Sequence, residues 1–360
     1  MTFKKIIIFY PSFERGGATN ILITIINFFL KKNVDVTLFS FNADYSFFTK
    51  SKNIRIIGSK TKIKSSRWLL NFLATYYLLK FLILNIDRIP IISFQSHIPA
   101  IILAKLFNKK IYIRNSEEIF GATRYSDNKF NAILVFFLKI IFYNLADKII
   151  AISIKSKNSL KKIILKKSKV ILIYNPYLIN NKKFKFKKSK KKFNILCIGR
   201  LTSQKNFKLV IGAINYLSLI YSNINFTLVG SGPLKRTLKS QSDGNIKFLN
   251  WTKNVKKHFM QSHLFILPSY YEGLPNALIE ATYYSVPSIA TDCSGVRDIL
   301  IGNKGGYIVP IDELNKLKRK ISFVINNYAN AKKKVLYAKK RLTNFNVSNC
   351  KYFYKLIIKK

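Results

Sequence analysis

The feature that most constrains the fold is an alternation of short apolar runs with helical stretches, which occurs twice along the chain. Apolar strands that are separated by helices indicate a parallel sheet that is covered on both faces. In the first half, the runs that predict strands are 4–9, 34–40, 54–57, 90–94, 110–114, 147–152 and 169–173. In the second half, they are 193–199, 224–230, 245–250, 263–268, 286–290 and 305–309. The sequence therefore predicts two doubly wound α/β domains.

The two halves are separated by NPYLINNKKFKFKKSKKKF, in which a proline precedes a polar lysine run with little helical periodicity. A chain of 360 residues is also long for a single hydrophobic core. We predict an N-terminal domain at 1–178, a lysine-rich linker at 179–192 and a C-terminal domain at 193–345. Residues 311–360 have the pattern of helices, and we expect the last segment, 346–360, to pack back on the first domain.

The charge balance is strongly basic, because 63 lysines and arginines stand against 15 acidic residues and give a formal net charge of +48. The lysines accompany many Ile, Asn, Phe and Tyr residues, whose codons are A/T-rich, so composition bias accounts for part of the charge. The functional interpretation is attraction to an anionic surface, either lipid headgroups or nucleic acid. The lysine runs lack the arginine-rich and aromatic patterns that nucleic-acid binders use. We therefore expect an anionic membrane surface as a partner and no nucleic acid.

Two apolar stretches, 68–86 and 131–146, raise the question of membrane spans. Each carries a lysine near its middle, Lys80 or Lys139, which is costly at the centre of a bilayer. We therefore expect helices that are buried or that lie at a membrane interface, in a peripheral protein. The three cysteines have scattered spacings that fit neither a disulfide framework nor a zinc site, which indicates a reducing compartment.

Charged side chains follow two strands of the predicted second domain. After 193–199, Gly199 allows a sharp turn, and Arg200 and Lys205 lie on the loop that leads into a helix near Phe207. Two cations beside a helix N-terminus suit a diphosphate. The alternative is that both are ordinary surface cations of a lysine-rich protein.

The stretch PSYYEGLPNALIEA places Glu272 in a strand's exit loop and Glu280 about two turns into the following helix, with Pro275 in its first turn. At 1.5 Å per helical residue the two acids would lie about 10–12 Å apart. That separation exceeds what a pair of glycosidase carboxyl groups requires. Either the acids hold hydroxyls at different parts of one extended ligand, or they are an exposed loop acid and a capping acid.

Four blocks, IGRLTSQKNF, LVGSGPLK, FLNWTKNV and LPSYYEGLPNALIEA, occur in the order and spacing of glycosyltransferase family 4, which the chain resembles over most of its length. The resemblance implies the GT-B fold, with two doubly wound Rossmann-like domains facing each other across a cleft. It also implies retaining transfer of a hexose or N-acetylhexosamine from a nucleoside-diphosphate sugar to a saccharide hydroxyl. We expect a polyprenyl-diphosphate-linked acceptor in bacterial surface-polysaccharide (lipopolysaccharide or O-antigen) biosynthesis, at the cytoplasmic face of the cell membrane.

The resemblance also implies roles for individual residues. Arg200 and Lys205 would bind the donor diphosphate, Glu272 would hold hydroxyls of the donor sugar, and Glu280 would accept the ribose hydroxyls. We take Glu272, Arg200 and Lys205 as the catalytic candidates. The remaining donor contacts implied by motif are Asn250 and Trp251 at the base, the amides of Gly273 and Leu274 at the leaving phosphate, and the glycine-rich loop at Gly16 and Gly17.

The chain departs from the family pattern at several positions. Many members carry a histidine near the active site after the fourth or fifth strand, and here the candidates are His97, Arg114 and Asn115, unless His97 is simply a satisfied buried histidine. His263 begins a strand where an aspartate is usual, and we expect it only to pack or cap. Because no Asp-x-Asp pair occurs, we expect no metal and no cofactor. A GT-B epimerase or phosphorylase and a basic nucleic-acid-binding protein are the alternative functions.

Overall fold

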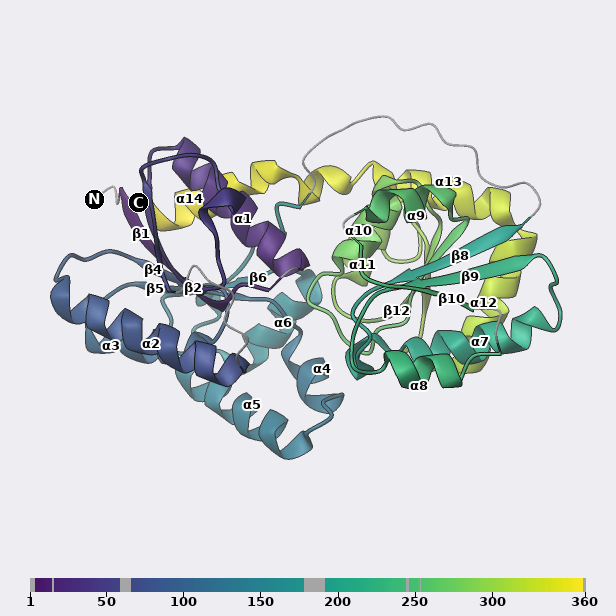
Figure 1. Ribbon diagram of the computed structural model, residues 1–360, viewed down its shortest axis with the longest axis horizontal. Helices are drawn as coiled ribbons and strands as arrows, with labels where there is room; N and C mark the ends of the chain where they lie inside the picture. The colour runs from purple at the N-terminus through teal and green to yellow at the C-terminus, as the bar shows by residue number, and fades with distance from the viewer. Residues whose placement is uncertain are drawn as a thin grey trace. The chain divides into compact units, whose positions relative to one another are not determined.

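The computed structural model describes residues 4–14, 16–58, 66–177, 192–243, 246–252 and 254–358, and the chain divides into two compact units. The first unit comprises Met1–Ile119, Phe130–Ile179 and Phe345–Lys360, and the second comprises Phe120–Lys129 and Asn180–Asn344 (Figure 1). The sequence places the domain boundaries at 178 and 193, and the linker expected at 179–192 lies outside the described residues except for Lys192. The short stretch Phe120–Lys129, which the sequence assigns to the first domain, is counted with the second unit.

The first unit is built on a parallel sheet with the strand order β3-β2-β1-β4-β5-β6-β7. All strands expected in this half are confirmed within a few residues at each end. They are β1 (Lys5–Ser12), β2 (Asp35–Phe41), β3 (Ile54–Ile57), β4 (Ile91–Ser93), β5 (Ile111–Asn115), β6 (Lys148–Ala151) and β7 (Val170–Leu172).

Helices cover both faces of this sheet. One face packs against α1 (Gly17–Lys31) and α14 (Cys350–Ile357), whose Phe353 and Ile357 are buried with the side chains of α1. The opposite face packs against α2 (Arg67–Leu84), α3 (His97–Leu106), α5 (Lys129–Tyr143) and α6 (Ile154–Ile163). The short helix α4 (Ile119–Arg124) precedes α5, and the 3-10 turns η1 (Tyr45–Phe47) and η2 (Lys167–Lys169) precede β3 and β7.

The second unit is built on a parallel sheet with the order β10-β9-β8-β11-β12-β13. Its strands also confirm the sequence-based positions. They are β8 (Phe193–Ile198), β9 (Ile224–Val229), β10 (Ile246–Leu249), β11 (Leu264–Leu267), β12 (Ser288–Thr291) and β13 (Tyr307–Val309). The connecting helices are α7 (Phe207–Ser218), α8 (Lys235–Ser240), α9 (Val255–Gln261), α10 (Asn276–Tyr283) and α11 (Val296–Leu300), followed by α12 (Leu314–Asn326) and α13 (Tyr328–Lys339).

The two faces of the second sheet are covered by different helices. Side chains of α7, α8 and α12 share one core with the strands. On the opposite face, Phe259 of α9 contacts Phe265 of β11, with ring centroids 5.5 Å apart. Cys197 and Cys293 are buried in this unit, Cys350 is buried in the first unit, and none of the three forms a disulfide bond.

The strand orders determine where ligands are expected. In an open parallel sheet, ligands bind beyond the carboxyl ends of the strands, where the strand order reverses direction. In the first unit the reversal lies between β1 and β4, and in the second it lies between β8 and β11. We therefore expect ligand-binding residues directly after these four strands.

Candidate active site

The reversal point of the second sheet brings two sequence motifs together. β8 pairs directly with β11, with Leu196 opposite Phe265. The loop after β8 contains Arg200 and a 3-10 turn, η3 (Ser203–Lys205), and the loop after β11 contains Glu272. Motifs that are separated by more than sixty residues thus leave the sheet side by side, at the edge where a ligand is expected.

A cation and an acid predicted for one ligand are in direct contact. The Nζ atom of Lys205 forms an ion pair with Oε1 of Glu272, and the Ser269 hydroxyl donates to the same oxygen at 2.7 Å. The Glu272 side chain is only 9% exposed, and that of Lys205 is 17% exposed. A buried charge is costly unless it is paired and hydrogen-bonded, and here each charge satisfies the other. A ligand that binds the ammonium group of Lys205 in place of Glu272 must also supply new hydrogen-bond partners for the Glu272 carboxylate.

The two loops are joined by further hydrogen bonds. The backbone N–H of Tyr270 donates to the carbonyl of Gln204 at 2.9 Å, and the Gln204 side chain donates to the carbonyl of Tyr271 at 3.0 Å. Asp312 accepts from Asn206 at 3.1 Å and from the Tyr270 hydroxyl at 3.2 Å. These bonds fix the loop that carries Lys205 against the loop that carries Glu272.

The segment Phe120–Lys129 contacts both of these loops. The rings of Tyr125 and Tyr270 stack with centroids 4.8 Å apart, and Ser203 donates to Asp127 at 2.5 Å. Burial raises the pKa of Tyr270, and the Asp312 carboxylate raises it further. The Tyr270 phenol therefore stays neutral at physiological pH and can donate to Asp312.

Glycines let a third loop approach β8. A Cβ atom on Gly230 would lie 1.9 Å from the carbonyl oxygen of Gly199, and one on Gly232 would lie 2.4 Å from that of Leu201. The N–H of Leu201 donates to the carbonyl of Ser231 at 3.0 Å across this contact. The Gly-Ser-Gly turn after β9 is therefore required by close backbone packing rather than by left-handed geometry.

The remaining donor candidates lie around this edge in different environments. Arg200 is exposed, whereas Gly273 and Leu274 are buried. Glu280 is half-buried on α10, four residues into a helix that begins at Asn276, so Pro275 is the N-cap residue and not part of the first turn. Asn250 and Trp251 follow β10 and are exposed. The Asn250 side chain accepts from Lys235, and the backbone N–H of Trp251 donates to the Ser231 hydroxyl at 3.2 Å.

Sequence reasoning missed the loop after β12. Gly295 has a φ of 79°, and a Cβ atom there would lie 2.9 Å from the Cα of Leu274 and 3.0 Å from the carbonyl oxygen of Gly273. The stretch Cys293–Gly295 thus packs directly on the loop that carries the donor candidates. A glycine five residues after a predicted strand, in the loop at the same sheet edge, was the signal that could have revealed it.

Cavities lie elsewhere in the described part of the second unit. Two neighbouring hollows of about 340 and 370 Å³ lie between α9 and the strands β9 and β10. They share Thr227, Lys247, His258 and Gln261 as lining residues, and the larger also touches Thr252 and Asn254 of the segment expected at the base. Neither is lined by Lys205 or Glu272.

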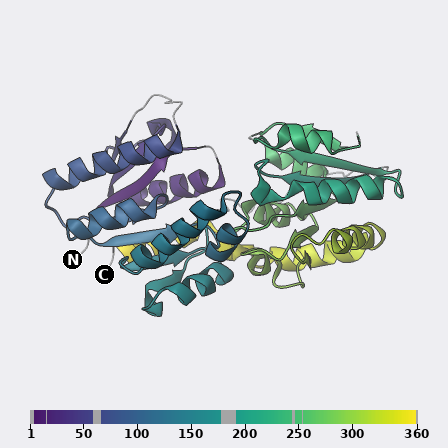
Figure 2. The ribbon, with the colours of Figure 1, turned by 90° about the horizontal axis from the view of Figure 1, so that it is seen from below.

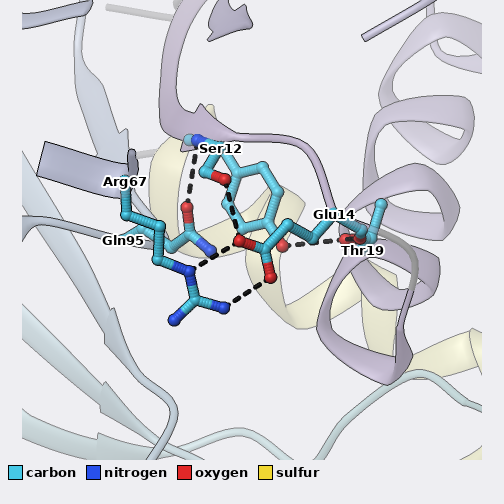
Figure 3. Close-up of polar contacts among 6 residues, drawn as sticks. Ser12, Glu14, Thr19, Arg67 and Gln95 are labelled. Atoms are coloured by element: carbon cyan, nitrogen blue, oxygen red, sulfur yellow. Dashed lines mark hydrogen bonds and ion pairs between the residues drawn. The ribbon is translucent and has the colours of Figure 1, made fainter. Parts of the chain in front are cut away.

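The reversal point of the first sheet holds a cluster of polar side chains (Figure 3). The Arg67 guanidinium donates to both carboxylate oxygens of Glu14, through Nε at 2.6 Å and through Nη2. Ser12, at the end of β1, donates from its hydroxyl to Glu14 at 3.2 Å and from its backbone N–H to Gln95 at 3.2 Å. The bidentate bond to Glu14 raises the pKa of Arg67. An exposed guanidinium, that of Arg67, and a half-buried amide, that of Gln95, thus lie at the ligand-binding edge of this sheet.

The glycine-rich loop adjoins this cluster. Gly16 is exposed as the N-cap residue of α1, Gly17 is the first residue of that helix, and a Cβ atom on Gly16 would meet nothing within 4 Å. Its φ of 166° is extended backbone that any residue adopts. Packing inside the unit therefore does not require a glycine at position 16.

The three first-domain candidates are placed differently from one another. His97 is half-buried at the start of α3, with Nδ1 2.8 Å from the Ser93 hydroxyl and its ring edge-on to Tyr143. Desolvation, and then Lys139 and Arg114, lower its pKa to about 3. The imidazole is therefore neutral at physiological pH and cannot serve as a cation for an acceptor.

Arg114 and Asn115 are each 1% exposed at the end of β5. Arg114 donates to Ser116 and Asn175 and lies over the Phe94 ring, while its Nε has no hydrogen-bond partner among the described residues. Burial lowers the pKa of Arg114 to about 10, so it remains a cation. Such burial gives both residues a supporting position behind the edge and leaves no room for direct contact with a ligand in this conformation.

His263 has the structural role that the sequence predicts. It is buried before β11, its Nδ1 accepts from the backbone N–H of Asn194 at 3.0 Å, and its ring stacks on Phe193. Among the residues that the structure describes, no group of three or more His, Cys, Asp or Glu side chains is placed to hold a metal ion.

Two parallel-sheet α/β units, with candidate residues at the reversal point of each sheet, are the architecture of the GT-B fold. A model of glycosyltransferase family 4 matches residues 15–177, and a model of glycosyl transferases group 1 matches residues 179–341. Together these matches cover almost the whole chain. The chain belongs to glycosyltransferase family 4, and it is a glycosyltransferase.

Individual proteins support this assignment. The amylovoran biosynthesis glycosyltransferase AmsD of Erwinia amylovora is 27% identical over 322 residues, which span 85% of this chain and 86% of the relative. A Campylobacter jejuni alpha-1,4-N-acetyl-D-galactosaminyltransferase, named for a GalNAc-containing PP-undecaprenol acceptor, is 26% identical over 96% of both chains. The structure of HepE from Anabaena in complex with UDP and glucose has a TM-score of 0.76 over 99% of both chains at 16% identity, which shows a shared fold.

Proposed function

We propose that the chain is a retaining enzyme that moves a hexose or N-acetylhexosamine from a UDP-sugar to a hydroxyl of a polyprenyl-diphosphate-linked saccharide. The observation that carries this proposal is the contact between Lys205 and Glu272 at the reversal point of the second sheet. The UDP bound by HepE supports the donor, and the PP-undecaprenol in the name of the Campylobacter relative supports the acceptor. The names of AmsD, for amylovoran biosynthesis, and of the Campylobacter transferase support a role in bacterial surface-polysaccharide biosynthesis, which we place at the cytoplasmic face of the membrane.

The donor would enter by an exchange of partners. Its diphosphate takes over the ammonium group of Lys205, with the exposed Arg200 as a second cation, and Glu272 is released to accept hydroxyl hydrogen bonds from the donor sugar. As the bond to the sugar breaks, the two cations and the amides of Gly273 and Leu274 stabilise the charge on the leaving diphosphate. Glu280, on α10, accepts from the ribose. The family resemblance supports transfer with retention.

The acceptor would meet the polar cluster of the first unit. Arg67 is held by Glu14 in the two-pronged geometry that a phosphate can also offer, so we propose that an acceptor diphosphate replaces Glu14. The open space above Gly16 admits the saccharide close to the backbone. His97 lies within the same edge, and its Nε2 is the ring nitrogen turned from Ser93, so it could meet an acceptor hydroxyl in its neutral form.

The test compares transfer by Glu272→Ala with transfer by a control, Glu313→Ala, after a thermal-shift screen of UDP-, GDP- and ADP-sugars has identified the donor. Glu313 is a half-exposed acid of the same unit, and its distance to Lys316 is 3.9 Å. Loss of one contact that stabilises the transition state lowers kcat about 10²–10³-fold. The control should transfer at the parental rate. A Glu272→Ala enzyme with parental turnover would refute the site.

The same assay separates the alternatives. An epimerase converts the nucleotide-sugar without any acceptor, and a nucleic-acid-binding protein is indifferent to Glu272 and shows a steep salt dependence on DNA. We also propose that no metal is needed, because lysine and arginine supply the positive charge at the diphosphate. Transfer should therefore be the same in EDTA as in Mg²⁺, and a rate that is lost in EDTA and restored by Mg²⁺ contradicts this part of the proposal.

A further inference from the structure

One face of the first unit is exposed and apolar. The helices α2, α3 and α5 lie side by side over the same face of the sheet (Figure 2), where α2 packs against α3 and the His97 ring of α3 contacts Tyr143 of α5. We call the outer surface of these three helices the apolar face. Its exposed large hydrophobic side chains, with those that directly follow α2, are Trp68, Leu69, Phe72, Tyr76, Tyr77, Ile83, Leu84, Ile86, Ile102, Leu106, Phe130, Ile133, Leu134, Val135, Phe137 and Ile141.

The clustering of these side chains is unusual for a protein surface in water. Isolated exposed hydrophobic residues are ordinary, but a contiguous patch of this kind marks an interaction surface. Trp68 and Phe130 are 74% and 77% exposed, and Trp68 stacks on Phe72 one turn further along α2. An aromatic pair that stacks in the open gains little from the fold itself. We therefore expect these side chains to bind a partner.

The charges of the apolar face identify the kind of partner. The sequences of α2, α3 and α5 contain no aspartate or glutamate, while they contain Arg67, Lys80, Lys105, Lys129 and Lys139. Acids of neighbouring segments, Glu14, Asp147 and Glu117, form ion pairs with Arg67, Lys105 and Lys139, so the net positive charge of these five side chains comes from the exposed Lys80 and Lys129. Aromatic and aliphatic side chains next to cations are the pattern of helices that lie in the interface of a bilayer with anionic lipids. A protein partner would have to be both apolar and acidic over the same area.

α2 lies on the sheet and does not cross a membrane. Among the described residues it is the one helix whose length and composition would allow a span. However, Leu70, Ala74, Leu78 and Leu82 form a stripe at four-residue spacing that is buried against the sheet. If α2 moved into the centre of a bilayer, the strands β1 and β2 that it covers would be exposed. The helix can therefore only present its other side to lipid.

We infer that the apolar face docks on an anionic phospholipid bilayer, with α2, α3 and α5 parallel to the membrane surface and their aromatic side chains inserted at headgroup depth. The inference rests on the proposed function in one respect, since an acceptor with a polyprenyl anchor gives the enzyme a reason to work at a bilayer. It adds which surface binds. Arg67, at the first turn of α2, then lies at the level where a lipid-linked diphosphate leaves the bilayer.

The first experiment measures flotation with vesicles of phosphatidylcholine alone and of equal parts phosphatidylcholine and phosphatidylglycerol. The test variant is Phe72→Ser with Phe137→Ser, which removes one aromatic ring from each of two helices, at 59% and 58% exposure. The control is Leu219→Ser with Ile220→Ser, two exposed apolar residues of the second unit. We expect the parent to float with the anionic vesicles, the test variant to bind at least tenfold more weakly, and the control to bind like the parent.

The second experiment uses tryptophan as a depth probe. The chain contains two tryptophans, Trp68 on the apolar face and Trp251 in the second unit, so Trp251→Phe leaves Trp68 as the single reporter. Anionic vesicles should shift the emission of Trp68 to shorter wavelength, and brominated acyl chains should quench it. The reverse variant, Trp68→Phe, should show neither effect.

Three results would overturn the inference: equal flotation of the test variant and the parent, a Trp68 emission unchanged on vesicles that carry the protein, or a parent dimer that Phe72→Ser with Phe137→Ser dissociates. The last result would make a second copy of the chain the occupant. None of these readouts requires sugar transfer. An enzyme that transfers sugar without binding vesicles contradicts only this inference, and a protein that binds vesicles without transfer contradicts only the proposed function.

Discussion

At the scale of single residues, each unit contains an ion pair between a candidate phosphate-binding cation and a glutamate. Glu14 holds Arg67 in the first unit, and Glu272 holds Lys205 in the second. The first pair is half-exposed, so solvent screens it and its net contribution to stability is small. The second is largely buried, so breaking it without a replacement is costly. If an anionic ligand exchanges with the carboxylate in both places, as we propose, the two sites should differ in how strongly they resist the exchange.

The exposed pair gives a kinetic prediction. Arg67→Ala should raise KM for a polyprenyl-diphosphate acceptor about 10–100-fold, because one charged, two-pronged hydrogen bond is worth about 1.5–3 kcal/mol. Donor KM and kcat should change little. Steady-state kinetics with each substrate varied in turn measures this, with Arg55→Ala, an exposed arginine of β3, as the control.

An acceptor analogue that lacks the diphosphate distinguishes the role of Arg67 further. With this analogue, Arg67→Ala and the parent should have the same acceptor KM. An equal defect with both acceptors would show that Arg67 supports the fold of the edge and does not read the phosphate.

At the scale of elements, the candidate donor site at the reversal point of the second sheet is built by loops that touch through glycines. Gly230→Ala places a methyl group 1.9 Å from the carbonyl oxygen of Gly199, so the loop after β8 has to move. We expect a loss of about 1–3 kcal/mol in the free energy of unfolding, as for other overpacked sites, together with a weaker thermal shift by the donor. Urea denaturation and donor titration measure the two effects.

Gly212→Ala is the matched control for this prediction. Gly212 lies within α7, where a Cβ atom would meet only the Leu314 side chain at 3.7 Å. Alanine is the better helix former by about 1 kcal/mol, so this variant should be more stable than the parent and bind donor normally. If Gly230→Ala and Gly212→Ala have the same stability and donor affinity, Gly230 is not required for the close approach of the two backbones.

The elements were largely predictable from the sequence, whereas their contacts were not. Apolar runs of β-branched residues locate every strand, because burial on both faces of a parallel sheet selects such residues locally. The pairing of Lys205 with Glu272 depends on which strands are neighbours, whereas the motifs assign the two residues separate roles on a ligand. Likewise, Phe120–Lys129 is counted with the second unit through contacts such as Tyr125 with Tyr270, which no local pattern records.

The candidate site was predictable to a similar degree. Motif spacing located the residues at the two reversal points. The burial of Arg114 and Asn115 was not foreseen, because an arginine at a strand end is usually exposed and only the tertiary packing over Phe94 encloses it. The apolar stretches 68–86 and 131–146 were expected as buried or interface-lying helices, and the exposed fractions of their side chains favour the second of these.

At the scale of the whole molecule, His97 should make stability depend on pH. Its pKa is about 3 in the folded chain and 6.5 in a free side chain, so the unfolded chain binds the proton more readily. The contribution of His97 to the free energy of unfolding is therefore complete above about pH 6.5 and is lost as the pH falls toward 3. The loss is at most about 1.4 kcal/mol per pH unit.

Urea titrations of the parent and of His97→Gln between pH 5 and 7 test this prediction. We expect the parent to lose stability more steeply than the variant as the pH falls. Parallel curves would mean that His97 titrates normally in the folded protein, and the desolvation that lowers its pKa would then be absent in solution.

The return of α14 to the first unit also bears on how the protein is made. Phe353 and Ile357 fill the same core as Ile21 and Phe29 of α1, although more than three hundred residues separate them along the chain. During synthesis, the first sheet emerges long before this helix and waits with part of its interior open to water. The second unit ends at Asn344, so it does not need α14 and can complete its fold first. Nascent chains that stop before residue 350 should therefore depend on chaperones to shield that open seam.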